Sequence, residues 1–272
     1  MRLGQLQHAG GHGAGTDRDC AAQHGARAVL RPQRPLQQAH EGALLRLPPA
    51  GLGLDSADVR ERMVQRLRQR GVCHDGLLGA MAAVPRHQFL DAALVAQAYE
   101  DTSLPIGHGQ TISKPSVVAR MIELLLDGAS ARQSASLGRV LEIGTGCGYQ
   151  AAVLSLLGRF VVSMERIKPL HDKARTLIGV ARADHLRLVF GDGTLGHAPN
   201  APYDSIIAAA GGDALPKAWL EQLAPGGRLV VPMRQPGDER QVLVVVDRTE
   251  QGIQQSVHES VNFVPLKSGL IG

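Results

Sequence analysis

A glycine-rich loop that follows an apolar run constrains the fold of this chain more than any other feature of its sequence. Residues 140–149 read VLEIGTGCGY, in which Gly144, Gly146 and Gly148 stand at alternate positions after Glu142. Glycine adopts backbone conformations closed to other residues and lets a ligand contact the main chain. A strand, a glycine loop and a helix in this order form the nucleotide-binding unit of doubly wound α/β folds. The segment therefore predicts such a unit, with an ordinary tight turn as the alternative.

The spacing of the glycines indicates which ligand the loop would hold. Dinucleotide-binding folds prefer G-x-G-x-x-G, with the pyrophosphate at the N-terminus of the helix. This chain has an acidic residue followed by G-x-G-x-G, a pattern suited to a ligand with a positive charge and no phosphate. S-adenosylmethionine is such a ligand, because a carboxylate can face its charged groups. We therefore assign these residues to an S-adenosylmethionine site: Glu142, Ile143, Gly144, Thr145, Gly146 and Gly148.

Downstream of the loop, apolar runs alternate with segments of helical periodicity. Such a pattern predicts a parallel sheet that is covered on both faces. We place its strands at residues 139–143, 160–164, 186–190, 203–209 and 228–233, and its helices at 150–157, 169–181 and 217–223. Residues 241–247 and 256–264 have no helix between them, which predicts an antiparallel pair at the C-terminal edge. The expected fold is α/β, with a doubly wound, mostly parallel sheet of seven strands.

The chain upstream of the loop divides into two parts. Residues 1–53 are rich in Gly, His, Gln, Arg and Ala and bury too little apolar surface to offset the entropy of ordering. We expect a disordered extension there, or one that results from an upstream start of translation. Residues 54–272 then form one domain, with a helical substrate part at 54–138 and a sheet core at 139–272. In the helical part we predict helices from about 54, at 75–83 and at 113–126, a loop at 99–111 and a polar linker at 127–137.

Composition disfavours several other classes of protein. Aromatic residues make up 3% of the chain, and the net charge of +4 includes no lysine and arginine block, so we expect no nucleic-acid partner. No apolar stretch approaches the roughly 18 residues that cross a bilayer, and the first residues lack a signal-peptide core. We therefore expect a cytoplasmic protein without membrane contact, and a monomer. The cysteines lack C-x-x-C spacing, so we expect no metal site.

Two acidic residues follow predicted strands, at the sheet edge where ligands of open α/β sheets bind. Glu165 lies about 20 residues beyond the glycines, where an acid can accept hydrogen bonds from both ribose hydroxyls. Asp192 can accept from an adenine amino group. A solvated acid and a simple turn are the respective alternatives. Residues 208–212 (AAAGG) offer a floor of small side chains, or merely pack tightly. The cofactor site gains these residues: Glu165, Arg166, Asp192 and Gly193.

Three stretches resemble the protein-L-isoaspartate O-methyltransferase family of the seven-stranded, S-adenosylmethionine-dependent class. Residues 104–115 (LPIGHGQTISKP) resemble its hallmark loop, residues 161–166 (VVSMER) its acidic strand, and residues 261–266 (VNFVPL) its C-terminal strand. The resemblance covers residues 54 to 266 and includes no counterpart of the extension. Two departures concern the substrate side. Ser116 stands where the family often has an aromatic residue, and residues 208–212 replace a longer strand end.

The resemblance implies an activity and a set of site residues. The family transfers a methyl group from S-adenosylmethionine to the α-carboxylate of L-isoaspartyl residues in damaged proteins and peptides, which initiates their repair. On this resemblance Ser113 is the catalytic residue that orients the substrate carboxylate, although spacing alone would make it a helix N-cap. Gln110, Thr111 and Ile112 would join the cofactor site. Substrate binding would fall to Ile112, Ser113, Val261, Phe263, Val264 and Pro265.

The implied chemistry needs no general base. A carboxyl group free in water has a pKa of about 3.9, so its carboxylate is already the nucleophile at neutral pH. The chain has no Asn/Asp-Pro-Pro-Tyr motif of amino-methylating enzymes, and no Ser or Cys arranged with His and Asp for acyl transfer. Three alternatives stay open: methyl transfer to another carboxylate or small molecule, NAD-dependent dehydrogenation, and a non-catalytic binding module on the same fold.

Overall fold

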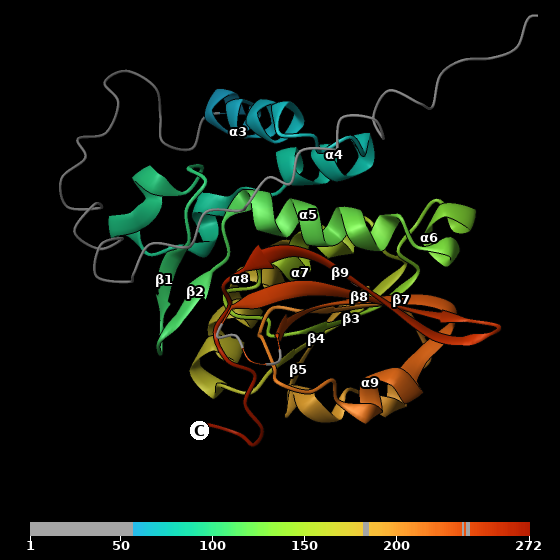
Figure 1. The fold of residues 1–272 in the computed structure, drawn as a ribbon. Helices are drawn as coiled ribbons and strands as arrows, with labels where there is room; N and C mark the ends of the chain where they lie inside the picture. The colour runs from blue at the N-terminus through green and yellow to red at the C-terminus, as the bar shows by residue number, and fades with distance from the viewer. Residues whose placement is uncertain (1–56, 182–184, 236, 238–239) are drawn as a thin grey trace, which may run out of the picture.

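The computed structural model describes residues 57–272, apart from 182–184, 236 and 238–239. The extension expected at residues 1–53 lies outside the described residues. Helices lie on both faces of a central sheet, which gives three layers (Figure 1). Within the described ranges, every helix is too short or too polar to span a bilayer.

The central sheet has seven strands in the order β5-β4-β3-β6-β7-β8-β9. Strands β5 to β7 in this order pair in parallel, whereas β8 and β9 are added antiparallel, as predicted. The strands are β3 Arg139–Ile143, β4 Phe160–Glu165, β5 Leu186–Phe190, β6 Tyr203–Ala208, β7 Leu223–Arg234, β8 Gln241–Thr249 and β9 Gly252–Val261. The order reverses between β3 and β6, so their carboxyl ends form the switch point at which such sheets bind ligands.

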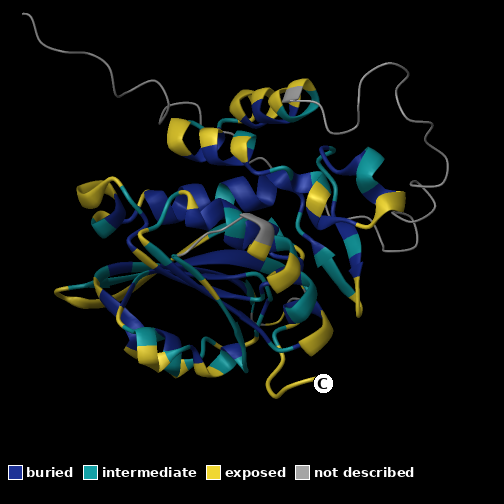
Figure 2. Ribbon diagram, turned by 180° about the vertical axis from the view of Figure 1, so that it is seen from behind, coloured by how far each residue is buried: buried dark blue, intermediate teal, exposed yellow. Residues whose placement is uncertain are grey.

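Alternate strand residues divide the core into two layers. Val140 and Ile207 pack on the face covered by α5, α7 and α8, whereas Leu141 and Ile206 pack with Trp219 of α9. Helix α5 is buried along nearly its whole length, which Figure 2 shows. Burial on both faces makes the sheet a rigid support for the loops at its carboxyl ends. The helices that cover it are α5 Pro115–Leu126, α7 Tyr149–Ser155, α8 Lys168–Ala181 and α9 Lys217–Gln222.

The part upstream of the sheet contains a hairpin that the sequence analysis missed. The prediction of a loop over residues 99–111 is wrong, because β1 (Leu104–Gly107) pairs antiparallel with β2 (Gln110–Ile112). The glycine signals that suggested a loop belong to the hairpin turn. His108 and Gly109 occupy that turn with φ angles of 53° and 68°. The hairpin lies beside the sheet and holds the turn that leads into α5 (Figure 1).

The remaining helical segments follow the predictions with two corrections. Helix α5 begins at Pro115, with Lys114 as its N-cap, so the predicted start at residue 113 is too early. The predicted polar linker at 127–137 contains a short helix, α6. The further elements are α3 Ala57–Gln69, α4 Asp75–Ala83, η2 Arg86–Phe89, η3 Ala92–Gln97, α6 Ala129–Ser134, η4 Gly193–Leu195 and η5 Ala198–Asn200.

The last strand differs from its predicted range of 256–264. Strand β9 begins at Gly252 and ends at Val261, because the chain then leaves the sheet edge. Pro265 instead forms an isolated parallel bridge with Gly211 after β6. The amide of Gly211 donates to the carbonyl oxygen of Val264 at 2.8 Å. This crossing brings residues 264–266 to the carboxyl ends of the parallel strands, where the predicted site lies.

Candidate active site

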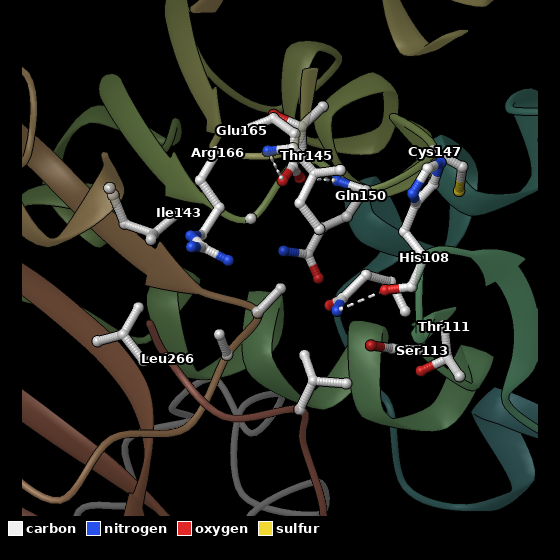
Figure 3. A pocket seen from close by; sticks show the side chains of 18 of the residues that line it. His108, Thr111, Ser113, Ile143, Thr145, Cys147, Gln150, Glu165, Arg166 and Leu266 are labelled. Carbon is white, nitrogen blue, oxygen red and sulfur yellow. Dashed lines mark hydrogen bonds between the residues drawn. The ribbon is translucent and has the colours of Figure 1, made fainter. Parts of the chain in front are cut away.

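A cavity of about 310 Å³ opens at the carboxyl ends of β3 and β4. Its walls come from the β1-β2 hairpin and the turn into α5, the glycine loop, the ends of β4 and β6, and the segment after β9. In Figure 3, Thr111 and Ser113 lie on one side of this cavity, opposite Ile143 and Leu266. The hallmark stretch and the glycine loop, which are separate in the sequence, therefore face a common space.

Backbone amides fix the glycine loop to the end of β4. The amides of Gly144 and Thr145 donate to the carbonyl oxygen of Met164 at 2.9 and 3.1 Å. The amide of Gly146 donates to Oε2 of Glu165 at 2.9 Å. Gly146 has a φ of 55°, a backbone conformation in the left-handed region that favours glycine. The loop lines the cavity with the backbone of Gly144 and Gly146 and with Thr145 and Cys147.

Gly148 has a structural role. It is the N-cap of α7, with a φ of 94°, and it does not line the cavity. A Cβ atom at this position would lie 2.8 Å from Cδ1 of Ile178 in α8. Both the backbone conformation and the close packing of α8 therefore require glycine here, whether or not a ligand is bound.

Glu165 lines the cavity and holds two backbone amides. Its side chain is buried, with Oε2 accepting from Gly146 and Oε1 accepting from the amide of Ile167 at 2.9 Å. Each carboxylate oxygen has a second lone pair, which a ligand hydroxyl can use. Glu165 therefore holds the glycine loop in its conformation and also lines the cavity in which a ligand would bind. The predicted ribose contact itself stays a prediction.

Glu142 does not line the cavity, whereas the sequence suggested either that it faces the methionine part of the donor or that it holds the loop through backbone amides. It is fully buried and accepts hydrogen bonds from Oγ of Ser163 and from Nε2 of Gln150. Burial raises the pKa of Glu142 to about 8, although these two hydrogen bonds act in the opposite direction. The side chain of Gln150 does line the cavity (Figure 3). Glu142 therefore orients the side chain of Gln150 through a hydrogen bond, without lining the cavity itself.

Ser113 lies on the turn between β2 and α5, and its side chain lines the cavity (Figure 3). The alternative of a helix N-cap is wrong, because Lys114 occupies that position. The carbonyl oxygen of Ser113 accepts a hydrogen bond from Nη2 of Arg86 at 2.7 Å. Arg86 is fully buried, so this contact ties the turn to the protein interior.

Asp192 is near the cavity but does not line it, whereas its neighbour Gly193 does. Oδ1 of Asp192 accepts from the amide and the hydroxyl of Thr194, and Oδ2 accepts from the amide of Gly269 at 2.6 Å. The carboxylate therefore accepts hydrogen bonds from other groups of the protein. The predicted contact with an adenine amino group stays a prediction.

The segment after β9 contributes to the cavity only beyond Phe263. Val264 and Pro265 line it, as predicted. Phe263 is buried in the core, and Val261 ends β9, so neither of these predicted substrate residues reaches the cavity. The backbone of Phe263 is instead bonded to the side chain of Gln241, whose Oε1 accepts from its amide at 2.7 Å. The prediction treated the stretch as one strand, but the chain turns within it.

Comparison with known proteins agrees with this geometry. The family model described as "Protein-L-isoaspartate(D-aspartate) O-methyltransferase (PCMT)" matches residues 58–270. The chain belongs to this family. A protein-L-isoaspartate O-methyltransferase of Methylibium petroleiphilum is 60% identical over 92% of this chain and 92% of its own length. One of Leptothrix cholodnii is 59% identical over 88% of this chain and 84% of its own.

Solved structures of the family share the fold. A protein-L-isoaspartate O-methyltransferase is 28% identical, with a TM-score of 0.69, over 78% of this chain and 67% of that chain. A putative one from Plasmodium falciparum, in complex with S-adenosyl-L-homocysteine, is 23% identical with a TM-score of 0.66, over 76% of this chain and 98% of that chain. The alignment with the Methylibium protein spans 250 residues, which is longer than the segment 57–272. That relative therefore matches part of the N-terminal extension, for which we expected no counterpart.

Most of the residues predicted from the family resemblance and the loop meet at the cavity. Those that line it are Gln110, Thr111, Ile112, Ser113, Ile143, Gly144, Thr145, Gly146, Glu165, Arg166, Gly193, Val264 and Pro265. Those that do not line it are Glu142, Gly148, Asp192, Val261 and Phe263. Lining residues outside these predictions include Tyr149, Gln150, Val118, Leu266, Lys267 and Ile271. Tyr149 and Gln150 could have been predicted, because they directly follow the third glycine of the loop. Nothing in the sequence around Lys267 and Ile271 indicated that they would line a site.

The two departures from the family pattern have different consequences. Ser116 is buried in α5, where its amide and hydroxyl each donate to the carboxylate of Asp101 at 2.9 Å. It does not line the cavity. Ala209 and Ala210 do line the cavity, which agrees with the predicted floor of small residues.

Two further reactive side chains, Cys147 and His108, belong to residues that line the cavity. Burial raises the pKa of the Cys147 thiol, which keeps it protonated in its place on the cavity wall. His108 lies at the hairpin tip and is exposed. Among the residues that the structure describes, no three His, Cys, Asp or Glu side chains are grouped as metal ligands.

Proposed function

We propose that this chain transfers a methyl group from S-adenosylmethionine to the α-carboxylate of L-isoaspartyl residues in damaged proteins and peptides. The observation that carries the proposal is the common cavity. It brings the glycine loop and Glu165 together with Ser113 and residues 264–266. The first pair suits an adenosyl donor, and the second suits an extended peptide whose carboxylate enters the cavity.

The donor fits the residues that are present. The glycine loop presents main chain to the cavity, and Glu165 has lone pairs beyond those used by the amides of Gly146 and Ile167. Ile143 and Met164 add apolar surface for a ring. When bound, S-adenosylmethionine supplies an electrophilic methyl group on a sulfonium. The glycine loop, Glu165 and Gln150 would hold it.

Ser113 orients the acceptor. Its hydroxyl would donate a hydrogen bond to one oxygen of the substrate carboxylate and leave the other oxygen free to take the methyl group, so that the products would be a methyl ester and S-adenosyl-L-homocysteine. Because the carboxylate is ionised at neutral pH, no residue has to remove a proton. Val118, Val264 and Leu266 add apolar surface to the cavity. Holding the reacting groups in line is worth up to about 7–11 kcal/mol in intramolecular reactions of small molecules.

A paired-peptide assay tests the proposed function. The protein is incubated with methyl-labelled S-adenosylmethionine and either an isoaspartyl peptide or its normal aspartyl twin. Label in the isoaspartyl peptide alone supports the proposal. Label in neither peptide, but in a small carboxylic acid, would favour a methyltransferase with another substrate. Failure to bind the donor would favour a non-catalytic binding module.

We also propose that the chain acts as a monomer and without nucleic acid. The mild net charge of +4 and the absence of a basic block in the sequence support the second point. Light scattering and a filter-binding assay over a salt series test these two statements. The cytoplasmic location expected from the sequence stays a prediction.

A further inference from the structure

The side chain of Gln241, at the start of β8, makes two hydrogen bonds to the backbone of Phe263. Its Oε1 accepts from the amide of Phe263 at 2.7 Å, and its Nε2 donates to the carbonyl oxygen of the same residue at 3.2 Å. Opposed residues of an antiparallel sheet exchange the same two kinds of bond. The carboxamide, here called the Gln241 clamp, therefore takes the place of a strand residue beside Phe263.

The Gln241 clamp lies where the chain leaves the sheet. Strand β9 ends at Val261, whose partner in the ladder is the backbone of Gln241. Phe263 follows closely and is buried in the core. Buried backbone groups need hydrogen-bond partners, and beyond Val261 the ladder no longer supplies them. The side chain of Gln241 supplies both partners, so it fixes the position from which the chain continues toward the cavity.

Residues 264–266, here called the acceptor wall, are the continuation of the chain. Gly211, after β6, holds them on their other side. Its amide donates to the carbonyl oxygen of Val264 at 2.8 Å, and its carbonyl oxygen accepts from the amide of Leu266 at 2.7 Å. All three residues of the wall line the cavity, whereas Gly211 and Gln241 do not. The wall is thus held in place by groups that lie outside the cavity.

Gly211 and the Gln241 clamp fit closely against each other. A Cβ atom at Gly211 would lie 2.4 Å from Nε2 and 2.7 Å from Cδ of Gln241. Gly211 is not among the glycines with a positive φ, so its backbone conformation is open to alanine. The missing side chain at Gly211 therefore leaves room for the carboxamide of Gln241.

We propose that Gln241 is a positioning residue for the acceptor, which sets the affinity for an isoaspartyl peptide by holding the acceptor wall in its binding conformation. The proposal rests on the proposed function, because it requires a peptide against residues 264–266. Without the clamp, the wall would adopt this conformation for only a fraction of the time. The apparent Kd for the peptide rises by the inverse of that fraction. A bound peptide holds the wall itself, so turnover at saturation does not depend on Gln241.

Peptide binding tests the proposal in Gln241→Ala. The probe is a fluorescent isoaspartyl peptide, whose anisotropy is followed with protein saturated with S-adenosyl-L-homocysteine. The Kd for the peptide, and its KM in the methylation assay, should rise about tenfold, as expected for two lost hydrogen bonds between neutral groups. The kcat at saturating peptide and the Kd for S-adenosyl-L-homocysteine should not change. A merely structural role would lower the free energy of unfolding and leave the KM of the folded protein unchanged.

Gly211→Ala disturbs the same clamp from the opposite side. Its Cβ would displace the carboxamide of Gln241 but leave every main-chain donor and acceptor in place. It should therefore raise the peptide Kd in the same way. In a chain that also carries Gln241→Ala there is no carboxamide to displace, so the combined variant should bind the peptide as Gln241→Ala alone does. If Gln241→Ala does not fold, Gly211→Ala alone decides the question.

The matched control is Gln255→Ala, because Gln255 is exposed on β9. Its peptide Kd, KM and kcat should equal those of the unmodified chain. Unchanged peptide affinity in either folded single variant would overturn the proposal. An equal loss of affinity for S-adenosyl-L-homocysteine would also overturn it, since the wall would then hold the donor.

A combined loss equal to the product of the single losses would overturn the proposal as well, because Gly211→Ala would then act without the clamp. The proposed function has a separate test in the unmodified chain. If that chain binds S-adenosyl-L-homocysteine but no isoaspartyl peptide, the proposed function itself fails.

Discussion

The buried guanidinium of Arg86 donates a hydrogen bond to the carbonyl oxygen of Ser113, with 2.7 Å between Nη2 and O. Its Nε also donates to the carbonyl oxygen of Ala98 at 2.8 Å, and its Cζ lies 4.8 Å from the ring centroid of Tyr149. A fully buried charge is costly unless it is paired and hydrogen-bonded. Here it joins the turn of the proposed catalytic serine to the core beneath the cavity.

We predict that Arg86→Met lowers both stability and turnover. The change leaves the carbonyl oxygens of Ser113 and Ala98 without their donor, at a cost of about 1–3 kcal/mol for each buried group. Denaturant unfolding measures the stability. The kcat with an isoaspartyl peptide shows whether the turn still holds Ser113 in position. Arg86→Lys keeps a charge and a donor, so it should recover part of both. Wild-type turnover in the methionine variant would show that Arg86 does not support the position of Ser113.

We predict that Ser113→Ala lowers kcat by about tenfold to a hundredfold, because a hydrogen bond to a carboxylate is worth about 1.5–3 kcal/mol. The Kd for S-adenosyl-L-homocysteine should not change, because the serine contacts the acceptor. Ser116→Ala is the matched control, since that hydroxyl bonds to Asp101 away from the cavity. Unchanged turnover in Ser113→Ala would remove this serine from the mechanism.

We predict that Glu165→Ala weakens donor binding by about tenfold or more. The change removes the acceptor of the Gly146 and Ile167 amides as well as the proposed ribose contact. Glu165→Gln keeps one oxygen, so its loss should be smaller. Calorimetric titration with S-adenosyl-L-homocysteine measures both. Equal affinity of the alanine variant and the unmodified chain would exclude the assignment.

We predict that Glu142 makes the protein less stable as the pH rises toward 8. Its folded pKa of about 8 lies above the ordinary value of 4.5, so the native state holds a proton that the unfolded state releases. The stability from this group is complete below pH 4.5 and is lost as the pH rises through 8, by up to about 1.4 kcal/mol per pH unit.

Glu142→Gln is neutral at every pH. Its amide oxygen can accept from Nε2 of Gln150 and its amide nitrogen can donate to Oγ of Ser163, so the variant isolates the effect of titration. Relative to the unmodified chain, the variant should gain stability steadily from about pH 5 to about pH 8. Unfolding curves in denaturant across this range make the comparison. Two curves that stay parallel would show that Glu142 does not titrate in this window.

The sequence predicted the strands and the main site residues because both depend on local patterns. The runs at 139–143 and 186–190 are apolar and short, and parallel strands buried on both faces have that pattern. Glu165 was predicted because it stands at the end of a predicted strand, and the carboxyl ends of parallel strands lie at the sheet edge where ligands bind. The hairpin at 104–112 was missed because its turn glycines are also typical of loops.

The tertiary contacts of the site could not be predicted in this way. Arg86 resembles a surface residue in the sequence, and its bond to Ser113 joins positions 27 apart. Asp192 was placed correctly at a strand end, but its Oδ2 accepts from the amide of Gly269, which lies 77 residues away. The sequence around these residues gives no indication of either hydrogen bond, because each bond depends on how separate elements pack.

A crystal structure with S-adenosyl-L-homocysteine bound tests the central claim most directly. We predict that its ribose lies beside Glu165 and the glycine loop, with its sulfur directed toward Ser113 across the cavity. A ligand bound at another surface, or one whose sulfur faces away from Ser113, would contradict the account.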